Sequence, residues 1–234
     1  DQSDEKFRIL IRNEPTLRLD GVKSLEVSVP ETDYHEDDDY MHRYYGSLFK
    51  ALVPILPNLR ELDLSGCNYI DLGKFTILCP HLEHIKQNNM IHNKFHLSIV
   101  GNEIREAFKL KEIIMDNSAF DGGCRQRLAD LENDRYKHIF LFHKCRSTVL
   151  ERVSIRNAIF KYDDDKLLDE MEKQGNFVYD PGYFGFEKTV FVPQNALIKF
   201  VRNAPSSLKW FRSNLSQENM DMLRFERPGI DFLN

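Results

Sequence analysis

The stretch that decides the fold is Leu59-Arg60-Glu61-Leu62-Asp63-Leu64-Ser65-Gly66-Cys67. Its apolar residues are spaced by three and then by two, which is neither the stripe of an amphipathic helix nor the simple alternation of a strand. The spacing predicts a short strand entered from a tight turn, with Leu62 and Leu64 on one face. Cys67 follows the strand, three residues after Leu64.

Similar stretches recur along the chain, at Val22–Val27, Leu82–Gln87, Leu110–Phe120, Leu150–Phe160 and Leu208–Phe211. The copies at 110–120 and 150–160 agree almost position for position, and we predict each to be one strand. Each copy has an apolar residue that we expect to point into the core, and we call it the anchor. The anchors are Leu25, Leu62, Ile85, Ile113, Val153 and Phe211.

The pattern L-x-x-L-x-L-x-x-C resembles the cysteine-containing leucine-rich repeats of F-box-type and ribonuclease-inhibitor-like proteins. The resemblance implies an α/β leucine-rich-repeat solenoid, curved, with parallel strands on the concave face and helices and insertions on the convex side. It also implies that the small side chain of Cys67, at the Asn/Cys position of the repeat, turns inward and satisfies backbone groups of a neighbouring coil. We expect a single domain over residues 1–234, with about six irregular repeats from 22 to 233. Insertion loops at 30–40 and 162–191 would explain the uneven spacing of the anchors.

The same resemblance implies a function. It implies a non-catalytic protein–protein interaction module, with substrate recognition for a ubiquitin ligase as one role. A free-standing leucine-rich-repeat scaffold or inhibitor is the alternative. We expect a protein partner, no cofactor and a monomer.

Apolar periodicity and capping residues predict further elements between and after the strands. Ser216 is the expected N-cap of the last helix, and Pro193 opens the one before it. The predicted helices cover residues 40–53, 99–109, 125–145, 166–172, 193–201 and 216–223, with a helical or irregular return at 75–78 and a final edge strand at 229–233.

The residues that flank each anchor are expected to face away from the core, on the concave surface, where solenoids usually bind their partners. The early strands are acidic there, and the last two are basic and carry a tryptophan. This arrangement favours a protein ligand with a matching charge gradient, although an ordinary solvated sheet face would explain the same residues. The predicted partner-binding residues are Glu61, Asp63, His84, Lys86, Glu112, Asp116, Arg152, Arg156, Trp210 and Arg212.

Three other clusters suit structural roles better than functional ones. The aromatic loop 177–191 is either a docking loop or a seal over the gap between strands, and we favour the seal. The cysteines and histidines at 67, 79, 81, 84, 92 and 96 lack the paired spacing of a zinc site. The acidic runs at 36–39 and 163–165 lack the spacing of a calcium loop.

The sequence contains none of the common catalytic motifs: no G-x-S-x-G, P-loop, G-x-G-x-x-G or H-E-x-x-H. Cys124 and Cys145 lie near His138 and His143, so an enzyme using the 124–145 helix is a further alternative. A buried helix with surface histidines explains these residues more simply. We therefore expect no catalytic activity.

The net charge, the apolar runs and the cysteine spacing limit the classes of partner and the cellular compartment that we expect. A net charge of −5 and a pI of about 5.9 argue against a general nucleic-acid binder. No apolar run approaches the ~20 residues of a membrane span, and the charged start has no signal-peptide core. The four cysteines form no C-x-x-C pair. We expect them to be reduced, in a protein located in the cytoplasm or nucleus.

Overall fold

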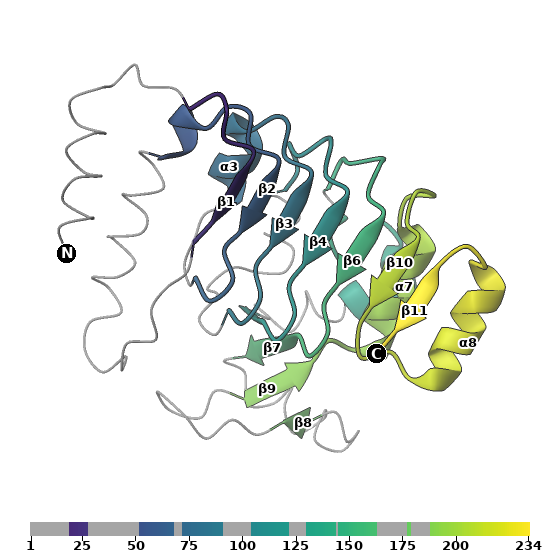
Figure 1. The fold of residues 1–234 in the computed structure, drawn as a ribbon. Coiled ribbons are helices and arrows are strands. Elements are labelled where there is room, and N and C mark those ends of the chain that lie inside the picture. The colour runs from purple at the N-terminus through teal and green to yellow at the C-terminus, as the bar shows by residue number, and fades with distance from the viewer. Residues whose placement is uncertain are drawn as a thin grey trace.

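The computed structural model of the chain describes residues 19–27, 52–67, 72–90, 104–121, 130–143, 145–162, 177–178 and 188–234. The fold is α/β and is dominated by a seven-stranded parallel sheet (Figure 1). Among the described residues, no helix combines the length and the apolar character needed to cross a membrane.

The seven strands of the main sheet are three residues each and lie side by side in chain order. All neighbouring pairs are parallel. The strands are β1 (Ser24–Glu26), β2 (Glu61–Asp63), β3 (His84–Lys86), β4 (Glu112–Ile114), β6 (Arg152–Ser154), β10 (Trp210–Arg212) and β11 (Asp231–Leu233).

The pairing register confirms that the six predicted anchors form one row. Each anchor stands opposite the anchor of the neighbouring strand, and Phe232 of β11 adds a seventh member. Phe232 also confirms the predicted final edge strand, which pairs with β10. The row is buried except at Leu25, which is half-buried on the outermost strand.

The strands predicted over 110–120 and 150–160 are wrong as continuous elements, because a turn divides each of them. Asn117 and Asn157 have φ values of 53° and 55°, in the left-handed region that asparagine tolerates better than most residues. Beyond these turns the chain forms β5 (Ala119–Asp121) and β7 (Ile159–Tyr162), which pair with each other in a second sheet.

The second sheet has the order β5-β7-β9-β8. Strands β8 (Phe177–Val178) and β9 (Lys188–Phe191) come from the predicted insertion 162–191, and β9 pairs antiparallel with both β7 and β8. The insertion therefore extends this sheet, which Figure 1 shows below the main one. The side chains of 161–190 lie outside the described residues, so the choice between docking loop and seal stays a prediction.

The described helices lie in the connections between strands. Helices α3 (Leu72–Leu78), α7 (Gln194–Asn203) and α8 (Gln217–Glu226) confirm the predictions for those segments. Ser216 caps α8 as predicted, since its Oγ accepts a hydrogen bond from the Asn219 amide at 3.2 Å. Short 3₁₀ turns occur at η1 (Val53–Ile55) and η2 (Asp134–Tyr136).

Two helix predictions are wrong over most of their described residues. Residues 104–109 form turns, with Ile104 buried and Phe108 53% exposed, so these two side chains do not share a packed face. In the 125–145 segment, residues 130–132 are helical as predicted, but from residue 133 the chain passes into η2 and turns, and Phe142 adopts a left-handed φ of 55°. The predicted helices at 40–53, apart from its last residues, and at 166–172 lie outside the described residues, as does loop 30–40.

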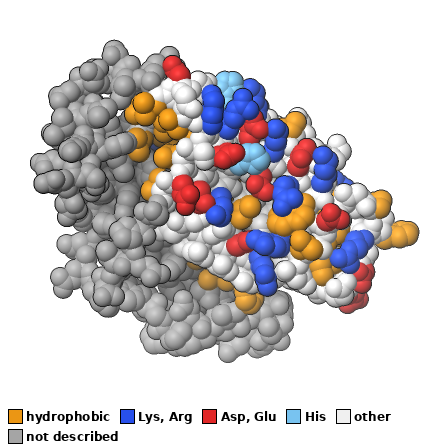
Figure 2. Space-filling model, viewed as in Figure 1, with side chains coloured by type: hydrophobic (Ala, Val, Ile, Leu, Met, Phe, Trp, Pro, Cys, Tyr) orange, Lys and Arg blue, Asp and Glu red, His pale blue; other side chains and the backbone are white. Residues whose placement is uncertain are grey.

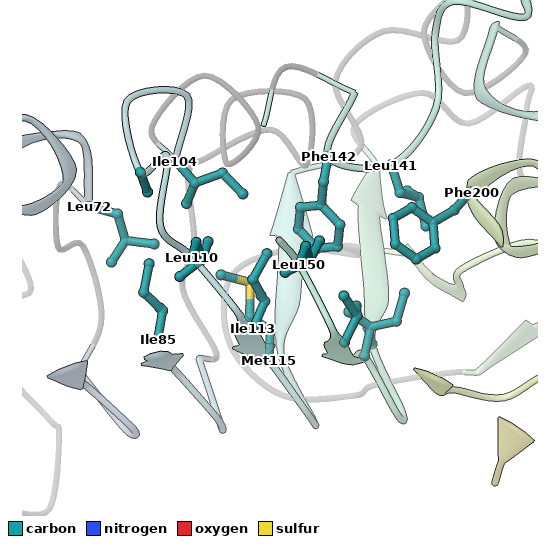
Figure 3. Close-up of a cluster of buried hydrophobic side chains, with 14 of the residues drawn as sticks. Leu72, Ile85, Ile104, Leu110, Ile113, Met115, Leu141, Phe142, Leu150 and Phe200 are labelled. Atoms are coloured by element: carbon teal, nitrogen blue, oxygen red, sulfur yellow. The ribbon is translucent and has the colours of Figure 1, made fainter. Parts of the chain in front are cut away.

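The core fills the space between the main sheet and the returning segments (Figure 3). Phe200 of α7 lies 5.2 Å from Phe211 of β10 and 5.8 Å from Phe142, measured between ring centroids. Cys67 turns inward as predicted, and its Sγ donates to the Val27 carbonyl at 3.5 Å. Aromatic packing and thiol–backbone contacts thus connect successive turns of the chain.

A buried lysine adds a polar link to this core. Lys199 of α7 donates from Nζ to the carbonyls of Asp130 at 2.6 Å and Asn133 at 2.9 Å. Burial lowers the pKa of Lys199, although the nearby Asp134 and Asp130 act in the opposite direction. The two hydrogen bonds fasten the 130–136 segment to α7.

Candidate functional site

The exposed side of the main sheet carries two straight rows of side chains, set by the strand register. We call this surface the charged sheet face. Acidic and basic side chains intermingle over the strands in Figure 2. The first row is Ser24, Glu61, His84, Glu112, Arg152, Trp210 and Asp231, and the second is Glu26, Asp63, Lys86, Ile114, Ser154, Arg212 and Leu233.

A chain of contacts runs along the first row from β3 to β10. His84 Nδ1 lies 3.3 Å from one oxygen of Glu112, and Arg152 Nε donates to the other at 2.7 Å. The Arg152 guanidinium also lies 4.2 Å from the centre of the Trp210 ring. Contacts between neighbouring strands therefore hold four predicted binding residues in place, namely His84, Glu112, Arg152 and Trp210.

In the second row, Lys86 of β3 pairs with Asp63 of β2 at 2.7 Å. Partial burial raises the pKa of Asp63, but hydrogen bonds from Lys86 and Ser65 outweigh it and lower that pKa overall. The hydrogen bond to Asp63 raises the pKa of Lys86 in turn. Both groups are therefore charged at neutral pH and neutralise each other.

Asp116 occupies a buried position just beyond β4 and joins three turns of the chain. Its carboxylate accepts hydrogen bonds from the Ser154 hydroxyl, the Arg156 amide and the Arg212 guanidinium. Arg212 Nε also donates to the Ser154 hydroxyl at 2.8 Å. Only 9% of the Asp116 side chain is exposed, so we assign this predicted binding residue a structural role.

Trp210 is half-buried beside two arginines. The Arg152 and Arg212 guanidinium groups lie 4.2 Å and 5.6 Å from its ring centre, within the range of cation–π attraction. The Arg156 side chain is exposed and makes no hydrogen bond or ion pair with the described residues. The structure thus brings the side chains of Arg152, Trp210 and Arg212 together at one end of the face, and it places the Arg156 backbone beside Asp116.

The predicted charge gradient is reduced by ion pairs between neighbouring strands. Lys86 neutralises Asp63, and Arg152 neutralises Glu112. Glu26 and Glu61 are exposed and form no ion pair with the described residues, which leaves excess negative charge on β1 and β2. At the other end of the face, Arg156 beside β6 is an exposed positive charge, and Asp231 of β11 is an exposed negative one; neither forms an ion pair with the described residues.

Sequence reasoning missed an asparagine ladder along the turns that follow the strands. Amide side chains donate from Asn117 to Asn89 at 3.1 Å, from Asn157 to Asn117 at 3.0 Å and from Asn214 to Asn157 at 3.1 Å. Three members occupy left-handed turn positions, where Gly66 stands in the earlier turn. The signal was an Asn or Gly placed four residues after each anchor from Leu62 to Val153.

Sequence reasoning also missed a second set of ion pairs, one residue before the strands. Glu83 pairs with Arg60 at 3.2 Å and with Lys111 at 2.6 Å, and Glu151 pairs with Lys209 at 3.1 Å. These residues alternate in charge from one strand to the next. The pairs bridge the strands and leave little net charge along this edge.

The described cysteines are suited to packing. Burial raises the pKa of Cys67 to about 12 and that of Cys79 to about 11. It also raises the pKa of Cys145, which favours the thiol over the nucleophilic thiolate. Cys124 lies outside the described residues.

No metal-binding cluster of three or more His, Cys, Asp or Glu side chains occurs in the described part of the chain. Cys67 and Cys79 each donate to a backbone carbonyl, of Val27 and Leu56 respectively. His84 faces Glu112, and His81 contacts Lys109. His92 and His96 lie outside the described residues.

Comparison with known proteins gives no family for this chain. No protein-family model matches it, and no curated protein matches it in sequence. The functional argument therefore rests on the charged sheet face and its contacts.

Proposed function

We propose that this protein is a non-catalytic leucine-rich-repeat solenoid that binds a protein partner on the charged sheet face. Parallel strands in chain order, with their anchors in one buried row, support the repeat architecture. The contact of Cys67 with the preceding turn supports it further, since repeats of this type place a small polar group there.

The observation that carries the binding proposal is Trp210, half-exposed on a sheet face and held beside Arg152 and Arg212. Tryptophan and arginine contribute more binding energy than most residues in protein interfaces. Side chains that are already positioned lose less conformational entropy when a partner binds.

The structure also shows which substitutions test the proposal cleanly. Charge reversal at Arg212 would place a carboxylate against buried Asp116, so loss of binding would be confounded with misfolding. Trp210 and Arg156 avoid this problem, because neither side chain donates a hydrogen bond to the described part of the core. The test variant is therefore Trp210→Ala combined with Arg156→Glu.

The experiment is affinity capture of partners from a native cell extract, quantified by mass spectrometry. We expect a protein captured by the unmodified chain to be lost with the double variant. Arg135→Glu is the control, because Arg135 is exposed in η2, outside the charged sheet face. Equal capture by all three proteins would contradict binding on this face.

The same captured material distinguishes the finer roles. The resemblance to F-box-type proteins implies substrate recognition for a ubiquitin ligase, which predicts that a cullin–adaptor complex is captured with the partner. A free-standing scaffold or inhibitor predicts the partner alone. Full-length chains are needed for this comparison.

A further inference from the structure

Three arginines lie on or just after β6 and β10, at one end of the charged sheet face. Arg152 and Arg212 approach the same Trp210 ring. The Arg156 amide and the Arg212 guanidinium bind the two oxygens of the Asp116 carboxylate. These contacts place the Arg152 and Arg212 guanidinium groups beside Trp210 and the Arg156 backbone beside the carboxylate that binds Arg212. We call this end of the charged sheet face the arginine patch.

Two of these guanidinium groups are held in place by hydrogen bonds from some of their nitrogen atoms, and their other nitrogen atoms make no hydrogen bond with the described residues. Arg152 uses Nε for Glu112, and its two terminal amino groups make no hydrogen bond with the described residues. Arg212 uses Nε and Nη2 for Ser154 and Asp116, and Nη1 makes none. Together with the whole Arg156 guanidinium, these groups offer unused N–H donors at the surface.

Building on the proposed function, we infer that this patch is a carboxylate-binding site and receives an acidic segment of the partner protein. A guanidinium matches a carboxylate with two parallel N–H···O bonds. The carboxylates of Glu112 and Asp116 fix the arginines in place and offset two of the three positive charges. Arg156 adds a positive charge that has no counter-ion among the described residues, and exposed Asp231, opposite Trp210 on β11, adds one negative charge at this end.

The opposite end of the charged sheet face indicates which residues the partner's segment carries farther along. Glu26 and Glu61 leave β1 and β2 with excess negative charge, which favours basic residues of the partner there. From β2 to β10 there are four strand-to-strand steps. At about 4.8 Å each they span roughly 19 Å, the reach of about six extended residues. The fitting segment therefore carries acidic and basic residues about six positions apart.

Trp210 is the single tryptophan of the chain, so its fluorescence reports on this patch directly. The probe is a terminally blocked hexaglutamate peptide titrated into the full chain. We expect saturable binding that weakens with added salt. Arg156→Glu should weaken it at least about tenfold, or about 1.4 kcal/mol, whereas Arg135→Glu should match the unmodified chain.

A second pair of peptides tests the spacing. The first peptide has two lysines at one end and two glutamates at the other, with four serines between them. The second has the same composition, but its lysines and glutamates alternate along the peptide. We expect the separated peptide to bind more tightly. Equal affinity would overturn the proposed alignment across β2 to β10.

Three results would overturn the carboxylate site. The first is no fluorescence response to hexaglutamate, and the second is a response of Arg156→Glu equal to that of the unmodified chain. The third is that the chain binds a phosphoserine peptide or oligothymidylate but does not bind hexaglutamate. Trp210→Ala separates this inference from the proposed function. If Trp210→Ala loses the partner and the unmodified chain does not bind hexaglutamate, the charged sheet face is supported as the docking site and the carboxylate site is contradicted. Unchanged capture would remove both.

Discussion

At the scale of single residues, two carboxylates on the same sheet illustrate how burial changes the role of an ion pair. Asp63 pairs with Lys86 near the surface, and both side chains are partly exposed to water. Asp116 is almost fully buried and binds donors from two further turns of the chain. A solvated ion pair contributes little to stability. Loss of one member of a buried pair destabilises the fold strongly, because it leaves the other charge buried without a counter-ion.

We predict that Asp116→Asn lowers the free energy of unfolding by about 3 kcal/mol, because it leaves the Arg212 guanidinium without its counter-ion. Asp63→Asn is the matched control and should cost less than about 1 kcal/mol. Urea unfolding at neutral pH measures both values. Equal losses would contradict the structural role assigned to Asp116.

The buried thiols give a second residue-scale prediction. Cys67 and Cys79 have raised pKa values and donate to backbone carbonyls, so neither forms a thiolate readily at neutral pH. We expect a thiol reagent to label both only after unfolding, as mapped by mass spectrometry. Rapid labelling in the native protein would show that these turns are open.

The same labelling experiment tests the enzyme alternative. A catalytic thiol at Cys124 or Cys145 predicts rapid labelling of that residue in the native protein at neutral pH. Burial raises the pKa of Cys145, so we expect that residue to label more slowly than a free cysteine in solution. Fast labelling of Cys145 would favour the enzyme alternative over the binding proposal.

At the scale of elements, the turns after the strands share one backbone solution. Gly66, Asn89, Asn117 and Asn157 occupy equivalent positions with φ between 53° and 76°. A Cβ built at Gly66 meets no atom within 4 Å, so substitution there is limited by backbone strain alone. Asparagine relieves part of that strain by local hydrogen bonding.

We predict that Gly66→Ala destabilises the protein by about 1 kcal/mol through the left-handed φ. Gly66→Asn should cost clearly less, because asparagine already serves at the next three turns. Gly229→Ala is the control, since its surroundings are equally open and its φ is not left-handed. Thermal unfolding of the three variants provides the comparison, and equal shifts would contradict the argument.

The strand anchors could be predicted because apolar spacing alone determines which side chains reach the core. The breaks at Asn117 and Asn157 could not, because a continuous apolar pattern on both sides of a turn looks like one strand. The predicted 125–145 helix fails beyond residue 132 for a related reason. Its apolar residues fit helical spacing, but Phe142 turns the backbone into the left-handed region, and tertiary packing decided the outcome.

The composition of the charged sheet face could be predicted from the strand pattern, since residues flanking an anchor point away from the core. Its internal pairing could not, because strand order and register decide which charges become neighbours. Asp116 was predicted to bind a partner and instead lies buried against Ser154 and Arg212. Of the predicted binding residues, Arg156 and Glu61 are the exposed charges that form no ion pair with the described residues.

At the scale of the whole molecule, ion pairs between successive turns make stability depend on pH. Hydrogen bonds from Lys111 lower the pKa of Glu83, and those from Arg202 lower that of Glu226. The pKa of Asp63 is also lowered, as described above. A carboxyl group with a lowered folded-state pKa contributes stability above its unfolded value, and this is lost as pH falls through the folded value.

We therefore predict that the urea midpoint falls as pH is lowered below the ordinary carboxyl values of 3.8 for Asp and 4.5 for Glu. Glu226→Gln should make this dependence shallower, because it removes one linked proton. Glu61→Gln is the control, since Glu61 forms no ion pair with the described residues. A dependence unchanged by Glu226→Gln would contradict the role of the Arg202–Glu226 pair.

Binding of a protein partner on the charged sheet face is tested most directly by hydroxyl-radical footprinting of the complex with a captured partner. Trp210 lies on the charged sheet face, and Phe225 of α8, 90% exposed, provides an internal reference outside its two rows. We predict that the partner slows oxidation of Trp210 and leaves Phe225 unchanged. Protection of Phe225 with Trp210 oxidised as fast as in the free protein would contradict the proposal.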